Sequence, residues 1–157
     1  MSVHYSSKTV EWYTPKYIFE ALNVEFDLDP CHPNIKNKTP AKKHYILPIN
    51  DGLKDPWFGN IWLNPPYGKA LNDWMPKMAE HSNGIALIPV TVMPNRLTHI
   101  WLPTTTGLCF IKGRVPFVNQ EGSQGVNPHG SMLVAWGRHN YKSLINSKLG
   151  FCIKTKE

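Results

Sequence analysis

The residues best suited to chemistry are Asn64-Pro65-Pro66-Tyr67, which follow an apolar run and precede a pattern typical of a helix. Consecutive prolines fix two φ angles and remove two backbone donors, so their carbonyl oxygens remain as rigid acceptors. The Asn64 side chain adds an acceptor, and the Tyr67 ring adds a flat aromatic face. Such an arrangement suits a planar group that carries an NH2, because accepting both protons turns the nitrogen lone pair toward an electrophile. The residues fit equally well a proline-rich turn in which Tyr67 is a half-buried core aromatic.

The neighbouring segments predict where this tetrad lies. Residues 59–64 contain three consecutive apolar side chains and predict a buried strand, and apolar residues between Leu71 and Ala79 recur with helical spacing. Pro76 predicts that this helix kinks, or that it begins near Asp73 with the proline in its first turn. Ligands of open α/β sheets bind beyond the carboxyl ends of the strands, so we expect the tetrad at such an end.

The remaining pattern predicts an α/β fold, with a mostly parallel sheet flanked by helices in a single compact domain over residues 1–157. We expect residues 1–10 to be a loose tail, and the polar or proline-rich segments 31–56 and 113–130 to be mainly loops. Further strands are predicted at residues 23–29, 44–47, 84–90, 107–112, 131–136 and 151–154, and further helices at 17–22, 95–102 and 141–148.

Composition excludes several classes of protein. The 157 residues carry a net charge of +6 and are 41% apolar, which favours one folded domain with a core over a disordered chain. The longest apolar run, residues 85–90, falls far short of the roughly 20 residues that span a bilayer, and no signal peptide is evident. The 3 cysteines are widely spaced, which argues against a disulfide framework or a structural zinc site. We therefore expect a cytoplasmic protein, and the positive charge is compatible with a polyanionic partner.

An Asn-Pro-Pro-Tyr tetrad after a buried strand resembles the catalytic motif of amino-methyltransferases that use S-adenosylmethionine. The chain as a whole resembles the small phage-type Dam family of DNA adenine methyltransferases. Five segments carry this resemblance in the family's order and span nearly the whole chain: residues 11–15 (EWYTP), 26–31 (FDLDPC), 51–53 (DGL), 61–68 (IWLNPPYG) and 113–117 (GRVPF). The resemblance implies a Rossmann-like methyltransferase domain that methylates the N6 amine of adenine in double-stranded DNA, in a bacterial or phage-infected cell.

The resemblance also assigns catalytic roles to the tetrad. Asn64 and the Pro65 carbonyl, held rigid with Pro66, would accept the protons of the target amine. Tyr67 would stack on a base flipped out of the duplex, since the amine cannot be reached inside the stack. Transfer would be direct and in-line, with no covalent intermediate and no metal ion.

The cofactor residues implied by the resemblance lie in three segments. Asp29-Pro30-Cys31 would bind the methionine part of S-adenosylmethionine, with Asp29 against its ammonium group, although an Asp-Pro pair also commonly ends a strand. Trp12, Thr14 and Pro15 would lie against the cofactor, although Thr14 could instead cap a helix. Asp51 is the acidic candidate for the nucleoside end, or the cap of a turn. The usual glycine-rich loop is absent and the second-strand region is reduced, which is where the chain departs from the family pattern.

Basic side chains are the candidates for contact with DNA. They are Lys36, Lys38, Lys42, Lys43 and Arg114, although such lysines more often form a solvated face and the arginine could form an internal salt bridge. His32, His99 and His129 lack ligand spacing, so no metal is expected. Two alternatives remain: the same chemistry on an RNA adenine or a protein glutamine amide, and a basic DNA-binding module without a cofactor. The positive charge favours nucleic acid, and the intact tetrad favours an enzyme.

Overall fold

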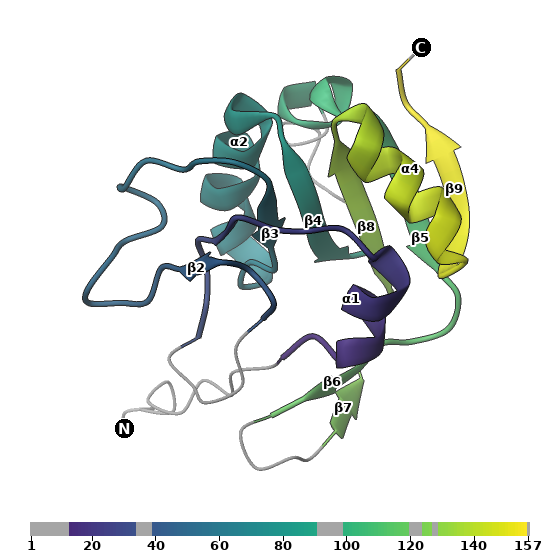
Figure 1. The fold of residues 1–157 in the computed structure, drawn as a ribbon, viewed down its shortest axis with the longest axis horizontal. Helices are drawn as coiled ribbons and strands as arrows, with labels where there is room; N and C mark the ends of the chain where they lie inside the picture. The colour runs from purple at the N-terminus through teal and green to yellow at the C-terminus, as the bar shows by residue number, and fades with distance from the viewer. Residues whose placement is uncertain (1–12, 34–38, 91–98, 120–123, 127–128, 157) are drawn as a thin grey trace.

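The computed structural model describes residues 13–33, 39–90, 99–119, 124–126 and 129–156 (Figure 1). Its strands are β1 (Leu28–Asp29), β2 (Lys43–His44), β3 (Ile61–Leu63), β4 (Gly84–Pro89), β5 (Gly107–Ile111), β6 (Pro116–Val118), β7 (Gln124–Val126), β8 (Ser131–Trp136) and β9 (Gly150–Lys154). Its helices are α1 (Lys16–Leu22), α2 (Leu71–His81) and α4 (Arg138–Ser147), with 3-10 turns η2 (Gly68–Ala70) and η3 (Leu102–Thr104). No helix in these ranges is long and apolar enough to cross a bilayer.

Seven of the strands form one mixed sheet in the order β2-β1-β3-β4-β8-β5-β9. The first four are parallel to one another, whereas β8 runs antiparallel to β4 and β5, and β9 runs antiparallel to β5. The predicted α/β class is confirmed, with a sheet that is parallel in one half and antiparallel in the other. Strands β6 and β7 form a separate antiparallel hairpin.

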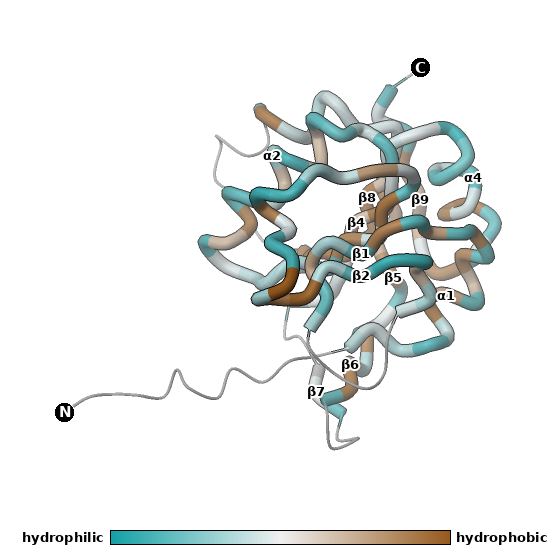
Figure 2. The backbone as a smooth tube through the Cα atoms, turned by 60° about the vertical axis from the view of Figure 1, so that its left-hand side comes forward, coloured by the Kyte–Doolittle hydropathy of each residue, from teal (hydrophilic) through white to brown (hydrophobic). Residues whose placement is uncertain are grey.

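Side chains of the central strands alternate between two buried clusters, as extended backbone requires. Ile61 and Leu63 pack with α2 on one face of the sheet, whereas Trp62, between them, packs with α1 and α4 on the other. All three side chains are 0% exposed, which explains why this strand has no polar position. The hydrophobic colouring in Figure 2 is concentrated in the middle of the sheet, around β4 and β8.

Several elements differ from those predicted. The strand expected at 44–47 is limited to Lys43–His44, and the tail expected at residues 1–10 and the first half of the helix expected at 95–102 lie outside the described residues. The alternating segment 23–29 forms a strand only over Leu28–Asp29, because Asn23 ends α1 in a left-handed conformation and the neighbouring β2 offers two residues for pairing. Helix α2 begins at Leu71 and contains Pro76, so a start near Asp73 with the proline in the first turn is wrong. The segment 113–130, expected to be a loop, contains the β6–β7 hairpin.

The connection between β1 and β3 places the candidate site. The chain leaves β1 for β2 on one side of it and then returns to β3 on the other side. Such a reversal is a topological switch point, where open α/β sheets bind ligands beyond the carboxyl ends of the strands. Asp29 is the last residue of β1 and Asn64 follows the last residue of β3, so both stand at this edge.

Candidate active site

Asn64 is oriented by a residue that lies far from it in the sequence. Its Nδ2 donates a hydrogen bond of 3.3 Å to the Oγ1 of Thr14, a residue that is 9% exposed. Because the amide nitrogen is turned toward Thr14, the Oδ1 atom points away from it and can accept a proton from another group. Thr14 is not a helix cap, since α1 begins after Pro15 and has no side-chain capping hydrogen bond.

The rest of the tetrad presents one buried and two exposed residues. Pro65 is buried, whereas Pro66 and Tyr67 are exposed, and Tyr67 belongs to neither buried cluster. Its exposed fraction is 39%, so part of the ring faces solvent. Burial of the remainder raises the pKa of Tyr67, while the neighbouring Ser131 hydroxyl opposes that shift. The phenol is therefore neutral, and its ring is an uncharged surface beside Asn64.

Asp29 is a buried carboxylate that accepts three hydrogen bonds. The Cys31 backbone N–H donates to its Oδ1 at 3.1 Å, and Thr39 Oγ1 and His32 Nδ1 donate to its Oδ2 at 2.7 and 3.0 Å. The residue is only 2% exposed. A carboxylate offers about four acceptor positions, so one on Oδ1 remains for a further donor. Burial, together with the Asp29 charge, raises the pKa of Cys31, which keeps this thiol protonated and unsuited to nucleophilic attack.

A cavity of about 30 Å³ lies between Thr14, Asp29 and Asn64, and the rest of the tetrad does not line it. Four of its lining residues were predicted as site residues: Thr14, Asp29, Cys31 and Asn64. Four others were not predicted: Tyr13, Pro33, Thr39 and Trp62. Tyr13 could have been found from its place beside Thr14 in the N-terminal motif. Trp62 could have been found from its place in the segment 61–68, two residues before Asn64. Pro33 and Thr39 carry no local signal, because only the folded chain brings them to the site.

The chemistry of this cavity fits the amino acid end of S-adenosylmethionine. Asp29 retains one acceptor position for an ammonium group, and Trp62 has a buried indole N–H with no hydrogen-bond partner in the described structure. The cavity volume of about 30 Å³ is enough for only a few water-sized groups. The enclosed space therefore admits a small group only, and the nucleoside of a cofactor must lie outside it.

One group of described residues has the composition of a metal site. Ligand-capable atoms of Asp29, His32 and His44 lie within 4.8 Å of one another. Hydrogen bonds account for this proximity: His32 Nδ1 contacts Asp29, and His44 Nε2 donates to the Thr39 carbonyl at 2.8 Å. The rings of the two histidines lie 4.5 Å apart, centre to centre. The arrangement is therefore explained as a buried hydrogen-bonded network, and the expectation of no metal stays a prediction.

Asp51 lies in a turn of its own and does not line the cavity. Its Oδ1 accepts from the Leu53 N–H at 2.9 Å, as expected of a turn cap. The next residue, Gly52, packs against the segment that follows β1, since a Cβ at this position would lie 1.9 Å from the Pro30 carbonyl oxygen. The Asp-Gly-Leu segment is thus fixed beside Pro30, while the role of Asp51 toward a nucleoside stays a prediction.

The structure describes only some of the predicted basic residues. Lys36 and Lys38 lie outside the described residues, as does Trp12, which was predicted to lie against the cofactor. Lys42 is exposed and pairs with Asp27 at 3.3 Å and Glu25 at 3.9 Å, which reduces the charge it offers to a partner. Lys43 is exposed on β2, and Arg114 is exposed between β5 and β6.

The β6–β7 hairpin is attached to the candidate site. Tyr13 and Val118 form an antiparallel bridge in which each backbone N–H donates to the other's carbonyl, at 2.7 and 3.1 Å. Tyr13 immediately precedes Thr14, so the hairpin is held against the segment that orients Asn64. Figure 1 shows the hairpin projecting beyond the sheet on the side where β4 ends.

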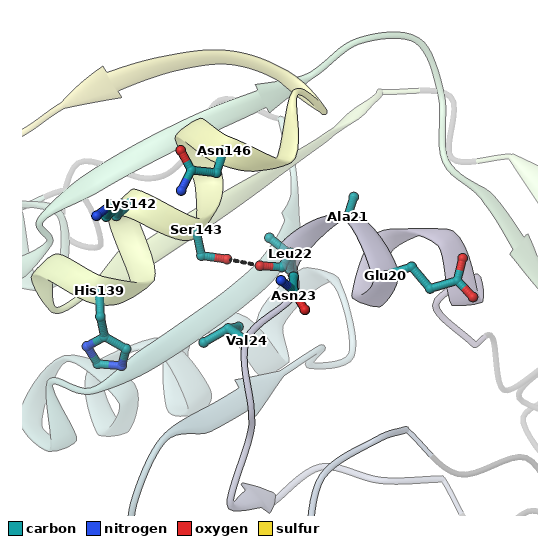
Figure 3. Close-up of a pocket in the computed structure, with 9 residues that line it drawn as sticks. All are labelled: Glu20, Ala21, Leu22, Asn23, Val24, His139, Lys142, Ser143 and Asn146. Atoms are coloured by element: carbon teal, nitrogen blue, oxygen red, sulfur yellow. Dashed lines mark hydrogen bonds between the residues drawn. The ribbon is translucent and has the colours of Figure 1, made fainter.

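A larger pocket of about 440 Å³ lies elsewhere, between the end of α1 and one side of α4 (Figure 3). The two helices are joined there by a hydrogen bond from Ser143 Oγ to the Leu22 carbonyl. Its lining residues are Glu20, Ala21, Leu22, Asn23, Val24, His139, Lys142, Ser143 and Asn146. None of them is a predicted site residue, so size alone does not mark the candidate active site.

Comparison with known proteins gives one match. Residues 2–150 match the family model described as DNA N-6-adenine-methyltransferase (Dam). No curated protein and no solved structure matches the chain significantly. The matched range includes the N-terminal motif, the ends of β1 and β3, and the hairpin.

Proposed function

Because this chain belongs to the DNA N-6-adenine-methyltransferase (Dam) family, we propose that it transfers a methyl group from S-adenosylmethionine to the N6 amine of adenine in double-stranded DNA. Family membership implies the DNA adenine methyltransferase activity. The single observation that best supports this site is the Thr14–Asn64 hydrogen bond at the switch point, because it engages the amide nitrogen and leaves the amide oxygen as an acceptor for the target amine.

The target amine is bound by two acceptors. Asn64 Oδ1 and the Pro65 carbonyl accept its protons, which directs the nitrogen lone pair toward the methyl carbon. A nitrogen–carbon bond would form in line with the breaking carbon–sulfur bond, and the methylated amine would then release one proton to water. Because Asn64 is held by Thr14 before substrate arrives, little reorganisation is needed at this step.

Adenine reaches these acceptors by leaving the duplex. Inside the stack its amine is paired and out of reach, so the base flips out and Tyr67 stacks on it. The exposed part of the Tyr67 ring supports this role, since a core aromatic could not receive a base. A neutral phenol suits stacking, because it adds no negative charge next to DNA.

The cofactor residues follow from the cavity. When bound, S-adenosylmethionine supplies an electrophilic methyl group on a sulfonium. Asp29 would pair with the ammonium group through its remaining acceptor position, and Thr14 and Cys31 line the same cavity. Pro15 and Pro30 do not line it and would contribute by fixing the backbone next to Thr14 and Cys31. In this proposal the chain folds as a Rossmann-like methyltransferase domain. Its second-strand region is reduced to the two residues of β2.

DNA lies across the edge of the sheet where β1 and β3 end. Lys42, Lys43 and Arg114 contact phosphates, and the β6–β7 hairpin reads the flanking sequence from its position next to Thr14. We expect the single domain to act in the cytoplasm of a bacterial or phage-infected cell. Specificity then rests on the hairpin and on the segment around β2.

Methyl-labelled S-adenosylmethionine tests this function. The purified chain is incubated with duplex DNA, RNA and a protein extract in parallel, and the products are digested to nucleosides or amino acids. We expect label in DNA alone, as N6-methyladenine. Label in RNA or in protein glutamine would contradict the substrate, and DNA binding without cofactor binding would contradict the enzyme.

A further inference from the structure

Two of the three cysteines face each other across neighbouring strands. Cys109 of β5 and Cys152 of β9 are direct partners in the antiparallel register. Both pack on the α1–α4 face of the sheet, Cys109 as a buried member of that cluster and Cys152 partly buried against it. Both thiols are free in this structure, and they are close enough for a thiol–thiol hydrogen bond.

The hydrogen-bond pattern shows which kind of pair the two cysteines form. Hydrogen-bonded and non-hydrogen-bonded pairs alternate along an antiparallel ladder. Just beyond the two ends of this ladder, Lys112 N–H donates to Leu149 O at 2.9 Å and Thr155 N–H donates to Thr106 O at 3.1 Å. The cysteine pair lies three positions from each of these pairs, so it is a non-hydrogen-bonded pair.

That position brings the side chains closest together. Non-hydrogen-bonded partners have Cα atoms about 4.5 Å apart, within the range of about 4.4–6.8 Å that a disulfide requires. The backbone therefore need not move for the two sulfur atoms to bond. By contrast, Cys31 lies at the end of β1 and is separated from β5 by β3, β4 and β8 in the sheet.

We propose that Cys109 and Cys152 form a reversible oxidation site that accepts a small-molecule disulfide such as oxidised glutathione and closes to an internal cross-strand disulfide. This inference does not depend on the proposed methyltransferase function. The more accessible Cys152 thiolate attacks one sulfur of oxidised glutathione, which forms a mixed disulfide and releases one glutathione thiolate. Cys109 then loses its proton and attacks the Cys152 sulfur, which releases the second glutathione. The two thiols are oxidised as glutathione disulfide is reduced to two thiols.

The buried environment controls the second step. Burial, together with the neighbouring Cys152, raises the pKa of Cys109 to about 12. Since the thiolate is the attacking form, only a small fraction of Cys109 reacts at neutral pH, and that fraction rises about tenfold for each pH unit. Closure is therefore expected to be slow at pH 7 and roughly a hundredfold faster at pH 9.

The disulfide would hold the edge strand β9 to its neighbour β5. Strand β9 is the terminal strand and pairs only with β5 among the described strands. A covalent bond in the middle of this pairing removes the freedom of β9 to separate from β5. We therefore expect oxidation to protect the β9 amides from hydrogen exchange and to raise the Tm by several degrees.

Peptide mapping tests the proposal on the full chain. The protein is treated with oxidised glutathione at pH 8.5, its remaining thiols are alkylated, and it is digested with trypsin without reduction. We expect the intact mass, measured before alkylation, to fall by two hydrogen atoms. After alkylation and digestion, tryptic peptides 97–112 and 149–154 should be linked, while peptide 17–36, which contains Cys31, is alkylated. Dithiothreitol should restore the original mass.

Two variants act as controls. Cys31→Ser should form the same link at the same rate, whereas Cys152→Ser should form none. A stable mixed disulfide on Cys152, a link that includes Cys31, or a link only between two chains would each overturn the proposal. The mapping of the unmodified chain decides the outcome even where a variant fails to fold.

Discussion

Thr14 accepts a hydrogen bond from the side-chain amide of Asn64, at 3.3 Å, although 50 residues separate them in the sequence. This contact connects the N-terminal segment to the carboxyl end of β3. It also fixes which end of the Asn64 amide faces the site, since the nitrogen is committed to Thr14. The acceptor that the proposed chemistry needs is therefore set by the fold before any ligand binds.

Thr14→Val should lower kcat by roughly tenfold, because it keeps the shape of the side chain but removes the acceptor that orients Asn64. Thr14→Ser keeps the hydroxyl and should retain most of the activity. Steady-state methylation of duplex DNA gives both values. Equal turnover in Thr14→Val and the unmodified chain would show that this contact does not orient the amide.

Tyr67→Ala should lower kcat/KM for duplex DNA by roughly 5- to 150-fold, since stacking on a base contributes about 1–3 kcal/mol. Tyr67→Phe keeps the ring and is the matched control, with activity near that of the unmodified chain. A large loss in Tyr67→Phe would assign the role to the hydroxyl instead of the ring.

The pH dependence of Tyr67 follows from its environment. Burial raises the pKa of this phenol above its ordinary value of 10.0, so the group stays neutral as the pH rises to that value. Tyr67→Phe and the unmodified chain should therefore have pH–rate profiles of the same shape between pH 7 and 10. An alkaline limb near pH 9 that the Tyr67→Phe variant lacks would contradict a neutral stacking ring.

Asp29→Ala should raise the Kd for S-adenosylmethionine by tenfold or more, because Asp29 is the only carboxylate among the described residues that line the cavity. Thr39→Val removes one hydrogen bond to the same carboxylate but keeps its charge, and should have a smaller effect. Calorimetric titration gives both constants, with circular dichroism to confirm folding. An unaltered Kd in folded Asp29→Ala would leave Asp29 as a residue that only ends β1.

Gly52→Ala should destabilise the protein by about 1–3 kcal/mol or more, because the added Cβ would lie 1.9 Å from the Pro30 carbonyl oxygen and 2.8 Å from the Trp74 ring. Gly113→Ala is the control: its φ of +74° carries a cost of about 1 kcal/mol, but its Cβ meets nothing within 4 Å. Urea unfolding measures both changes. Similar losses in the two variants would show that the Gly52–Pro30 packing is not tight.

The sequence predicted best those strands whose residues are almost all apolar. Residues 61–63, 84–89 and 131–136 form buried strands as expected, because continuous apolar side chains suit a strand covered on both faces. The β6–β7 hairpin was missed, since each of its strands has only three residues, too few to show an alternating pattern. The order of the strands in the sheet could not be predicted from local patterns either, because strand pairing joins segments that are distant in the chain.

The candidate site was predicted only in part, because short motifs reveal some of its residues and long-range packing supplies the others. Thr14, Asp29 and Asn64 stand out in short motifs, and the structure brings them to one cavity. Thr39 lines that cavity without belonging to any motif, because its position depends on the path between β1 and β2. Trp62 belongs to the segment 61–68, but only the folded structure shows that it lines the cavity. A contact that depends on long-range packing leaves no trace in a short window of sequence.

The central claim is that the Asn64 corner methylates adenine at N6, and the modified bases in cellular DNA test it most directly. DNA is isolated from cells that lack adenine methylation and express the unmodified chain, Asn64→Ala or Asn64→Asp, and its nucleosides are quantified by mass spectrometry. We predict N6-methyladenine with the unmodified chain, a fall of at least about a hundredfold with Asn64→Ala, and partial retention with Asn64→Asp, which keeps an acceptor oxygen. The account would be contradicted if folded Asn64→Ala gave as much N6-methyladenine as the unmodified chain. It would also be contradicted if the unmodified chain methylated another base and gave no N6-methyladenine.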